Sequence, residues 1–234
     1  MNPENSVVLK TPRPTRLLRE LRSIGEPLRL VPGVRKLLAG PRGSGRPVMV
    51  LPGFGAGNGS MALLRAYLRR MGHDVRGWPL GRNNGNVADM FPKVLSGVEQ
   101  FAKSAGQPVT LVGWSLGGYL SREVARKRPD LVSLVVTLGT PVEGGPKYTV
   151  FAGLYKRWGY DLDELERKMG GERSTPITTP TVAVYSKNDG IVDWRACLDR
   201  HTGGVEHVEV RTGHLFMGFS PETFRVVAER LARD

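Results

Sequence analysis

The sequence predicts an α/β protein in which helices flank a mainly parallel central sheet. Short runs of β-branched and other apolar residues recur along the chain, and segments with apolar residues at helical spacing separate them. The strand runs are apolar at consecutive positions, which is typical of parallel strands covered by helices on both faces. With 234 residues and a single cysteine, Cys197, the chain is long enough to bury a core without disulfides.

A basic segment precedes this alternation, and we expect a basic N-terminal helical extension over 1–46 and one α/β domain over 47–234. The extension holds ten lysines and arginines against three glutamates, so it carries +7 of the net charge of +12. Its apolar residues follow the 4, 3, 4 spacing of one helical face: Leu17, Leu21, Ile24 and Leu28. This spacing favours packing of the helix against the domain. The alternative is contact between the arginines and an anionic membrane surface, whereas nucleic acid is not favoured.

The first three predicted strands are short. The run "VMVL" at 48–51 predicts a buried strand, and a helix follows the glycine-rich loop after it. "DVRGW" at 74–78 predicts a short strand, followed by a helix with Val94 and Val98 on one face. "PVTLVGW" at 108–114 is rich in β-branched residues, which favour a buried strand.

The second half of the domain continues the pattern. The segment 116–127 predicts a helix, which Pro129 ends. The β-branched runs at 131–139, 180–186 and 205–210 predict three more strands. The last helix has a serine as its N-cap and a proline at its first position, Ser220 and Pro221.

The segment 146–178 interrupts the alternation between two predicted core strands. It is rich in aromatic residues and contains a helical run, "DLDELERKMGG", with Asp161 as the cap and Gly170 as the stop. A long aromatic insertion between core strands is either a cap or lid over a pocket or a decorated surface loop. We favour the lid.

The stretch "GWSLG" predicts a nucleophilic serine. Gly113 and Gly117 flank Ser115 in a G-x-S-x-G pattern, with a predicted strand before it and a predicted helix after it. A turn this sharp exposes the serine hydroxyl at the end of the strand and aims the helix N-terminus toward it. Without a strand before it and a helix after it, the G-x-S-x-G pattern is common in glycine-rich turns, which is the alternative to a nucleophile.

A serine nucleophile needs a base, and His214 is the candidate. It lies in a loop after the last predicted strand, at the edge of the sheet where open α/β folds bind ligands. Two other histidines have positions that favour structural or exposed roles, His201 and His207, whereas His73 precedes the serine and lies just before a predicted short strand.

The base needs an acid that orients it, and the turn after 180–186 offers Asp189. Asp193 comes one turn later, where it is the predicted N-cap of the next helix, and it is the substitute candidate. Asp199 is farther along, in a segment that we expect to be helical. Along the chain, these candidates occur in the order serine, acid and histidine, at positions 115, 189 and 214.

An acyl-transfer site also needs backbone donors for the developing oxyanion. We expect these to be the N–H groups of Leu116, after the serine, and Phe54, in the glycine-rich loop 51–59. That loop lacks the G-x-G-x-x-G dinucleotide pattern and a P-loop lysine, so a nucleotide site is not favoured. A polar loop, 81–85, is expected at the same edge, where Arg82 and the asparagines either bind a polar group or form a plain turn, which we favour.

Together these motifs resemble the α/β-hydrolase superfamily, and in particular its compact bacterial lipases and esterases. The resemblance rests on "VLPGFG", "GWSLGG", "GTP", "NDGIV" and "GHLFM" and covers about 47–234. Many lipases have histidine where this chain has Pro52 and Trp114, and these departures concern the type of substrate.

The resemblance implies hydrolysis of a small-molecule or lipid ester through an acyl-serine intermediate, with Ser115 as nucleophile, His214 as base and Asp189 as its orienting acid. It implies no metal and no organic cofactor. Apolar residues near the inferred site predict either an acyl pocket or ordinary core: Trp114, Phe216, Met217, Tyr155 and Trp158.

Two other function classes stay open at this point. The same triad serves acyltransferases and thioesterases, because the acceptor depends on the shape of the pocket and on water access. A non-catalytic basic binding protein on a hydrolase scaffold is weaker, because all three triad residue types occur in order. Residues 1–30 lack the apolar core of a signal peptide, and no apolar run reaches the about 20 residues of a membrane span, so we expect a cytoplasmic protein. The oligomeric state is not predicted.

Overall fold

The computed structural model describes residues 9–25, 37, 42–172 and 175–233. Six parallel strands form one sheet in the order β2-β1-β3-β4-β5-β6. The strands are β1 (Pro47–Leu51), β2 (Asp74–Gly77), β3 (Val109–Trp114), β4 (Val132–Leu138), β5 (Thr181–Tyr185) and β6 (Glu206–Glu209). The predicted fold class, a parallel sheet between helices, is therefore confirmed.

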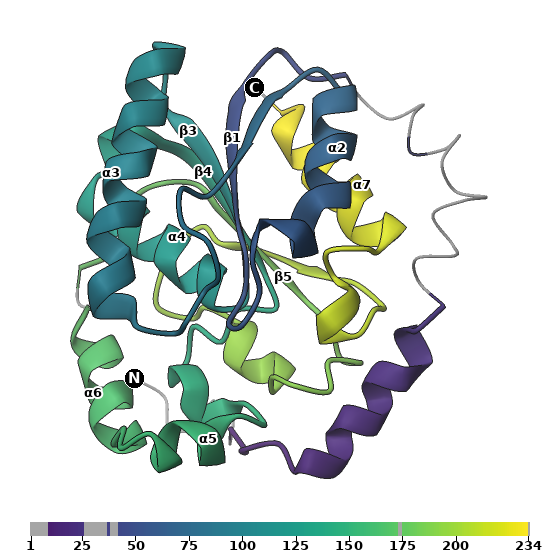
Figure 1. Cartoon of the computed structure of the whole chain (residues 1–234), viewed down its shortest axis with the longest axis vertical. Helices are drawn as coiled ribbons and strands as arrows, with labels where there is room; N and C mark the ends of the chain where they lie inside the picture. Colours follow the sequence, from purple (N-terminus) through teal and green to yellow (C-terminus); the bar gives the residue numbers. More distant parts are fainter. Residues whose placement is uncertain (1–8, 26–36, 38–41, 173–174, 234) are drawn as a thin grey trace.

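Helices cover both faces of the sheet (Figure 1). The α-helices are α2 (Ala62–Arg70), α3 (Val87–Ala105), α4 (Leu116–Lys127), α5 (Ala152–Arg157), α6 (Leu162–Glu172) and α7 (Pro221–Leu231). Short 3₁₀ helices are η3 (Asn58–Met61), η4 (Pro129–Leu131), η5 (Gly145–Tyr148), η6 (Trp194–Cys197) and η7 (His214–Phe216).

The core has two layers because successive side chains of a strand point to opposite faces. In β1, Val48 and Val50 pack on the side of α2 and α7, whereas Met49 and Leu51 pack on the side of α3 and α4. All residues of β3, at the centre of the sheet, are buried. The carboxyl ends of β3, β4 and β5 are thereby held rigidly by packed strands on both sides.

Two helix boundaries differ from the sequence prediction. Asp161 caps α6 by accepting the backbone N–H groups of Asp163 and Glu164, as expected, but the helix continues past Gly170 to Glu172. The stretch after Asp193 is helical only as far as Cys197, because η6 is a single 3₁₀ turn. A glycine in a helix is disfavoured but tolerated, which explains why Gly170 is a weak stop signal.

The predicted apolar packing of the N-terminal helix is wrong. This helix, η2 (Pro14–Ser23), is the purple helix of Figure 1 and is of the 3₁₀ type, with three residues per turn. Its leucines therefore do not form one face at the 3.6-residue period, and Leu17, Leu21 and Ile24 are 41%, 59% and 58% exposed. The buried side chains are instead Glu20 and Ser23. Leu28 lies outside the described residues.

The insertion over 146–178 and η2 both lie at the carboxyl edge of the sheet (Figure 1). In the insertion, Lys147 pairs with Asp163 and Glu166 of α6, each at 2.6 Å. The insertion is joined to the turn after β5 by the N–H of Val150, which donates to the carbonyl oxygen of Ile191 at 2.8 Å. Among the described residues, no helix is both long enough and apolar enough to span a bilayer.

Candidate active site

The serine sits on a sharp turn between β3 and α4. Ser115 has φ 53° and ψ −118°, and it is the only non-glycine residue with positive φ in the described part of the chain. Such a conformation costs on the order of 1–3 kcal/mol and persists where neighbours hold it. Here the N–H of Ser115 donates to Leu138 O at 2.8 Å, and the Thr140 hydroxyl donates to Ser115 O at 2.9 Å.

The glycine after the serine is required by close backbone packing. A Cβ on Gly117 would lie 2.5 Å from the carbonyl oxygen of Leu51 and 2.6 Å from that of Pro52. The first turn of α4 therefore lies directly against the end of β1 and the start of the loop that holds Phe54. This contact brings the serine and the predicted oxyanion loop together.

His214 and Asp189 form a buried pair at the neighbouring strand ends. The His214 Nδ1 and Asp189 Oδ2 atoms are 2.6 Å apart, and the two residues are only 3% and 2% exposed. The other carboxylate oxygen of Asp189 accepts the N–H groups of Ile191 at 2.8 Å and Val192 at 2.7 Å. Asp189 is thus fixed by its own turn and orients the imidazole through Nδ1.

The pKa of His214 is raised above its ordinary value by a balance of opposing effects. Burial removes water from the imidazolium and lowers the pKa, but the charge and hydrogen bond of Asp189 raise it, with a further contribution from the charge of Glu20. The net stabilisation of the imidazolium suits a residue that must accept a proton during a reaction. Within the described residues no hydrogen bond joins the Ser115 hydroxyl to His214, although both line the same cavity.

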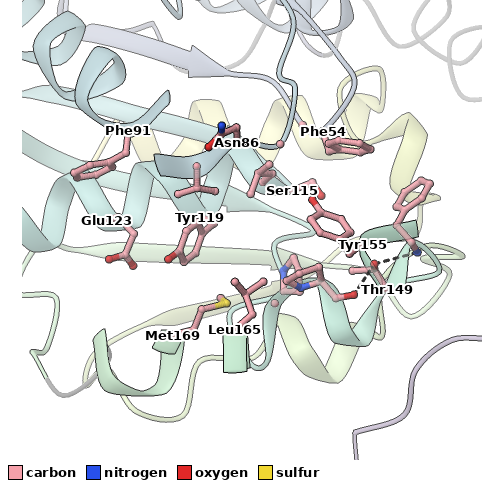
Figure 2. A pocket seen from close by; sticks show the side chains of 18 of the residues that line it. Phe54, Asn86, Phe91, Ser115, Tyr119, Glu123, Thr149, Tyr155, Leu165 and Met169 are labelled. Carbon is pink, nitrogen blue, oxygen red and sulfur yellow. Dashed lines mark hydrogen bonds between the residues drawn. The ribbon is translucent and has the colours of Figure 1, made fainter. Parts of the chain in front are cut away.

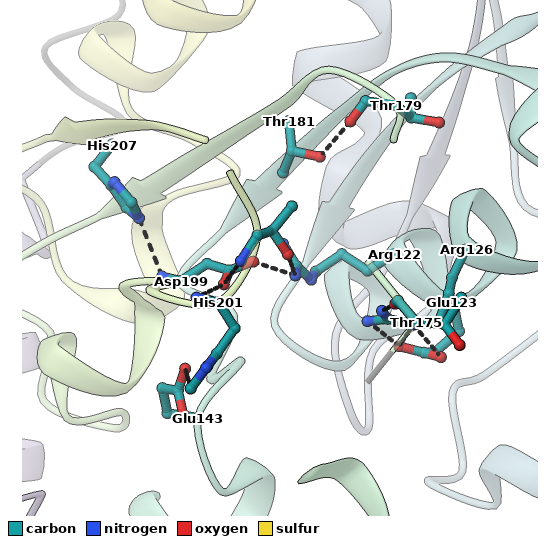
Figure 3. Close-up of polar contacts among 11 residues, drawn as sticks. Arg122, Glu123, Arg126, Glu143, Thr175, Thr179, Thr181, Asp199, His201 and His207 are labelled. Carbon is teal, nitrogen blue, oxygen red and sulfur yellow. Dashed lines mark hydrogen bonds and ion pairs between the residues drawn. The ribbon is translucent and has the colours of Figure 1, made fainter. Parts of the chain in front are cut away.

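The two other candidate acids have different partners. Asp193 is the N-cap of η6, as predicted, and accepts the N–H of Arg195 at 3.1 Å. Asp199 lies in the loop after η6, not in a helix, and pairs with Arg122 of α4 in a buried contact (Figure 3). Neither contacts His214.

The other histidines lie away from Asp189 and His214. His207 of β6 accepts the N–H of Asp199 at 3.0 Å, and His201 lies 3.2 Å from Glu143 (Figure 3). His73 is buried just before β2. The positions of His201 and His207 agree with the structural or exposed roles expected for them.

The loop after β1 is braced by an asparagine that sequence reasoning undervalued. Asn83 is fully buried; its side-chain amide donates to Pro52 O at 2.9 Å, and its backbone carbonyl oxygen accepts the N–H of Gly55 at 2.7 Å. Arg82 donates to Gly55 O at 2.7 Å. The loop 81–85 therefore holds the loop of Phe54 in place. Within the described chain, no protein acceptor is hydrogen-bonded to the N–H of Phe54 or of Leu116.

A second missed residue, Glu20, comes from η2. Its carboxylate accepts three backbone N–H groups: that of Gly190 at 2.7 Å, that of His214 at 2.9 Å and that of Leu215 at 2.9 Å. Ser23 accepts the N–H of Gly213 at 2.7 Å. A Cβ on Gly190 would lie 2.5 Å from Arg16 O, so glycine is needed where η2 meets the turn 188–192 that holds Asp189, which we name the acid turn. Glu20 thus ties the acid turn to the loop 213–217 that holds His214, which we name the histidine loop.

A cavity of about 720 Å³ opens beside the serine. Figure 2 shows Phe91 and Tyr119 on one side of Ser115 and Phe54 on the other. Across the cavity, α6 contributes Leu165 and Met169. The volume is typical of small-molecule sites, and the lining is mostly apolar with a few polar groups. Its polar members include Glu123, Arg126 and Thr175.

The predicted pocket residues divide into two groups. Trp114 and Tyr155 line the cavity, and the Trp114 indole N–H also donates to His214 O at 3.1 Å. Trp158, Phe216 and Met217 are not among the lining residues. Met217 is fully buried in the core, whereas Trp158 is 49% exposed and packs against Phe54 with ring centroids 5.6 Å apart. Trp114 therefore both positions the histidine loop and shapes the cavity.

No group of three or more histidine, cysteine or acidic side chains is arranged to hold a metal ion in the described ranges.

The sequence matches no protein-family model and no curated protein. The structure is similar to that of a monoacylglycerol lipase from Paleococcus ferrophilus, with a TM-score of 0.60 and 17% identity over 80% of this chain and 96% of that one. An α/β superfamily hydrolase from Oenococcus oeni has a TM-score of 0.59 and 16% identity over 82% and 94%. The thioesterase domain from the curacin biosynthetic pathway has a TM-score of 0.57 and 12% identity over 83% and 93%. The chain has the α/β-hydrolase fold.

Proposed function

We propose that this protein of α/β-hydrolase fold is a serine hydrolase that cleaves carboxylic esters through an acyl-serine intermediate. The observation that carries the proposal is the buried Asp189–His214 pair, whose histidine lines one cavity together with a serine on a strained turn. The lipase among the similar structures supports an ester as the substrate.

In the acylation half of the proposed reaction, Ser115, His214 and Asp189 each have one role. As Ser115 Oγ bonds to the ester carbonyl carbon, His214 Nε2 takes the hydroxyl proton, and Asp189 stabilises the imidazolium through Nδ1. The carbonyl oxygen becomes an oxyanion that accepts the N–H groups of Phe54 and Leu116. Cleavage of the ester C–O bond then releases the alcohol, which takes the proton from His214.

Deacylation repeats these steps with water. His214 takes a proton from water as the oxygen attacks the acyl carbon, and the proton returns to Ser115 Oγ as the acid leaves. Because Glu20 and Asp189 both hold the histidine loop, the imidazole keeps its position through both half-reactions. No residue outside the described triad and donors is needed to balance the protons.

The apolar cavity favours an acyl chain longer than acetyl. Each methylene buried in an apolar pocket contributes about 0.8 kcal/mol, or about fourfold in affinity. We therefore expect kcat/KM for p-nitrophenyl esters to rise about fourfold per methylene from acetate until the chain fills the space between Phe91 and Met169.

The test is turnover of this ester series by the wild type and by Ser115→Ala. The variant should lose at least about 10⁴-fold in kcat, as should Asp189→Asn, which leaves the imidazole in the wrong tautomer. Ser96→Ala, on the side of α3, is the matched control and should keep full activity. Retained turnover in Ser115→Ala would remove the nucleophile from the mechanism.

A thioesterase is the second candidate, because a thioesterase domain is among the similar structures. It would use the same triad, and the comparison of acyl esters with acyl thioesters of the same chain length separates the two. A kcat/KM that is higher for the thioester than for the ester at every chain length would favour a thioesterase.

A further inference from the structure

The helix η2 buries its polar side and exposes an apolar one. With three residues per turn, Glu20 and Ser23 share the side that faces the domain. Leu18, Leu21 and Ile24 share another side, also at three-residue spacing, and are 67%, 59% and 58% exposed. We name these three residues the apolar ridge. Large apolar side chains grouped on a surface mark an interaction site rather than ordinary surface composition.

The remaining side of η2 is cationic. Four arginines at three-residue spacing form an arginine row beside the apolar ridge: Arg13, Arg16, Arg19 and Arg22. Within residues 9–25 the only acidic side chain is Glu20, whose carboxylate is buried in three hydrogen bonds to the catalytic loops. Among the described residues, no carboxylate forms an ion pair with the arginine row. The exposed charge of this helix is therefore entirely positive.

The helix also lies next to the cavity. The N–H of Leu215 donates to Glu20, and the Leu215 side chain is 44% exposed and lines the cavity. The histidine loop thus carries a further exposed leucine at the point where η2 meets the cavity wall. A surface bound by η2 would lie close to the opening of the candidate active site.

We propose that η2 docks the protein on the surface of an anionic lipid bilayer, with the apolar ridge inserted between headgroups and the arginine row on their charges. An apolar face bordered by arginines is the pattern of helices that lie in the bilayer interface. Each part alone gives weak, reversible binding, whereas apolar insertion and charge attraction act together on anionic lipid.

An anionic bilayer accounts for both the apolar ridge and the arginine row. Nucleic acid would use the arginine row but would leave Leu18, Leu21 and Ile24 exposed to water. A second copy of the chain would bury the apolar ridge but would bring two positively charged rows together. The proposal concerns binding and holds independently of whether Ser115 acts as a nucleophile.

The test is co-sedimentation of the full chain with vesicles of phosphatidylcholine, alone or mixed with phosphatidylglycerol, at low and high salt. All proteins carry Ser115→Ala so that turnover plays no part. We expect binding to the anionic vesicles that weakens with salt. Leu18→Gln with Leu21→Gln should reduce it about a hundredfold or more, since each buried leucine contributes roughly tenfold or more. Arg19→Gln with Arg22→Gln should reduce it roughly fivefold per arginine at low salt.

Matched controls come from exposed residues elsewhere. Leu63→Gln on α2 replaces a leucine that is 46% exposed, and Arg225→Gln on α7 replaces an exposed arginine; both should bind as the parent does. The proposal is overturned if the protein does not co-sediment with anionic vesicles, or if the control variants lose as much binding as the η2 variants. It is also overturned if the protein binds no vesicles and instead dimerises through the apolar ridge or binds RNA through the arginine row.

Discussion

Glu20→Gln should change both the stability of the protein and the pH dependence of its activity. The carboxylate accepts one N–H from the acid turn, at Gly190, and two from the histidine loop, at His214 and Leu215. A glutamine amide has a single acceptor oxygen, and its NH₂ group would face the N–H that the second carboxylate oxygen accepts.

The size of the effect on stability follows from these contacts. At least one charge-assisted hydrogen bond is lost, and such bonds contribute roughly 1.5–3 kcal/mol each. For a chain of this length the Tm falls by about 2–4 °C for each kcal/mol, so we expect a decrease of about 3–12 °C. Thermal unfolding followed by circular dichroism measures this change.

The effect on pH dependence has a definite sign. The charge of Glu20 helps to raise the pKa of His214, and the base must be neutral to accept a proton from Ser115. Activity therefore appears as pH rises through the pKa of His214, and loss of the charge should move this acidic limb of kcat/KM to lower pH. The assay is kcat/KM for a p-nitrophenyl ester as a function of pH.

A matched variant separates electrostatics from loop support. Ser23→Ala removes the acceptor for the Gly213 N–H in the same loop but changes no charge. It should lower the Tm while leaving the acidic limb where it is. If Glu20→Gln shifts the limb no more than Ser23→Ala does, or shifts it to higher pH, Glu20 does not act on the pKa of His214.

Two further predictions concern the core and the cavity. Arg122→Met leaves the buried carboxylate of Asp199 without its partner, which should cost roughly 3–5 kcal/mol in the free energy of unfolding by urea. Burial raises the pKa of Asp199, but Arg122 and backbone N–H groups lower it more, to about 2; its contribution to stability is thus present above about pH 4 and is lost as pH falls toward 2. In the variant this acid dependence should become smaller, because only the backbone N–H groups of His201 and Thr202 still lower the pKa of Asp199, and an unchanged urea midpoint would contradict the pairing. Met169→Trp narrows the cavity beside α6, so kcat/KM for long acyl esters should fall at least about tenfold while acetate is hydrolysed as before; an equal fall for all chain lengths would mean that the acyl chain does not reach Met169.

The sheet and the central pair could be predicted because their signals are local. The β-branched runs that became β3 and β4 lie within one residue of their predicted bounds, since parallel strands are buried on both faces. The positions of Asp189 and His214 followed from turns directly after strands, and the structure places their side chains in contact. By contrast, nothing in the sequence near Asn83 shows that its amide reaches back to Pro52.

The N-terminal helix shows why the rest could not be predicted. The spacing of Leu17, Leu21 and Ile24 fits a 3.6-residue period and suggests burial, but a 3₁₀ helix repeats every three residues and turns Glu20 toward the domain instead. Burial of a glutamate is favourable here only because three N–H groups from two distant loops converge on it, and those loops are adjacent only after the sheet has formed. The polar side of η2 is therefore satisfied by the folded domain, which leaves its apolar side without a protein partner within the described chain. A helix that is held to the domain through Glu20 and Ser23, and that exposes its leucines and arginines, is suited to a partner that is both apolar and anionic.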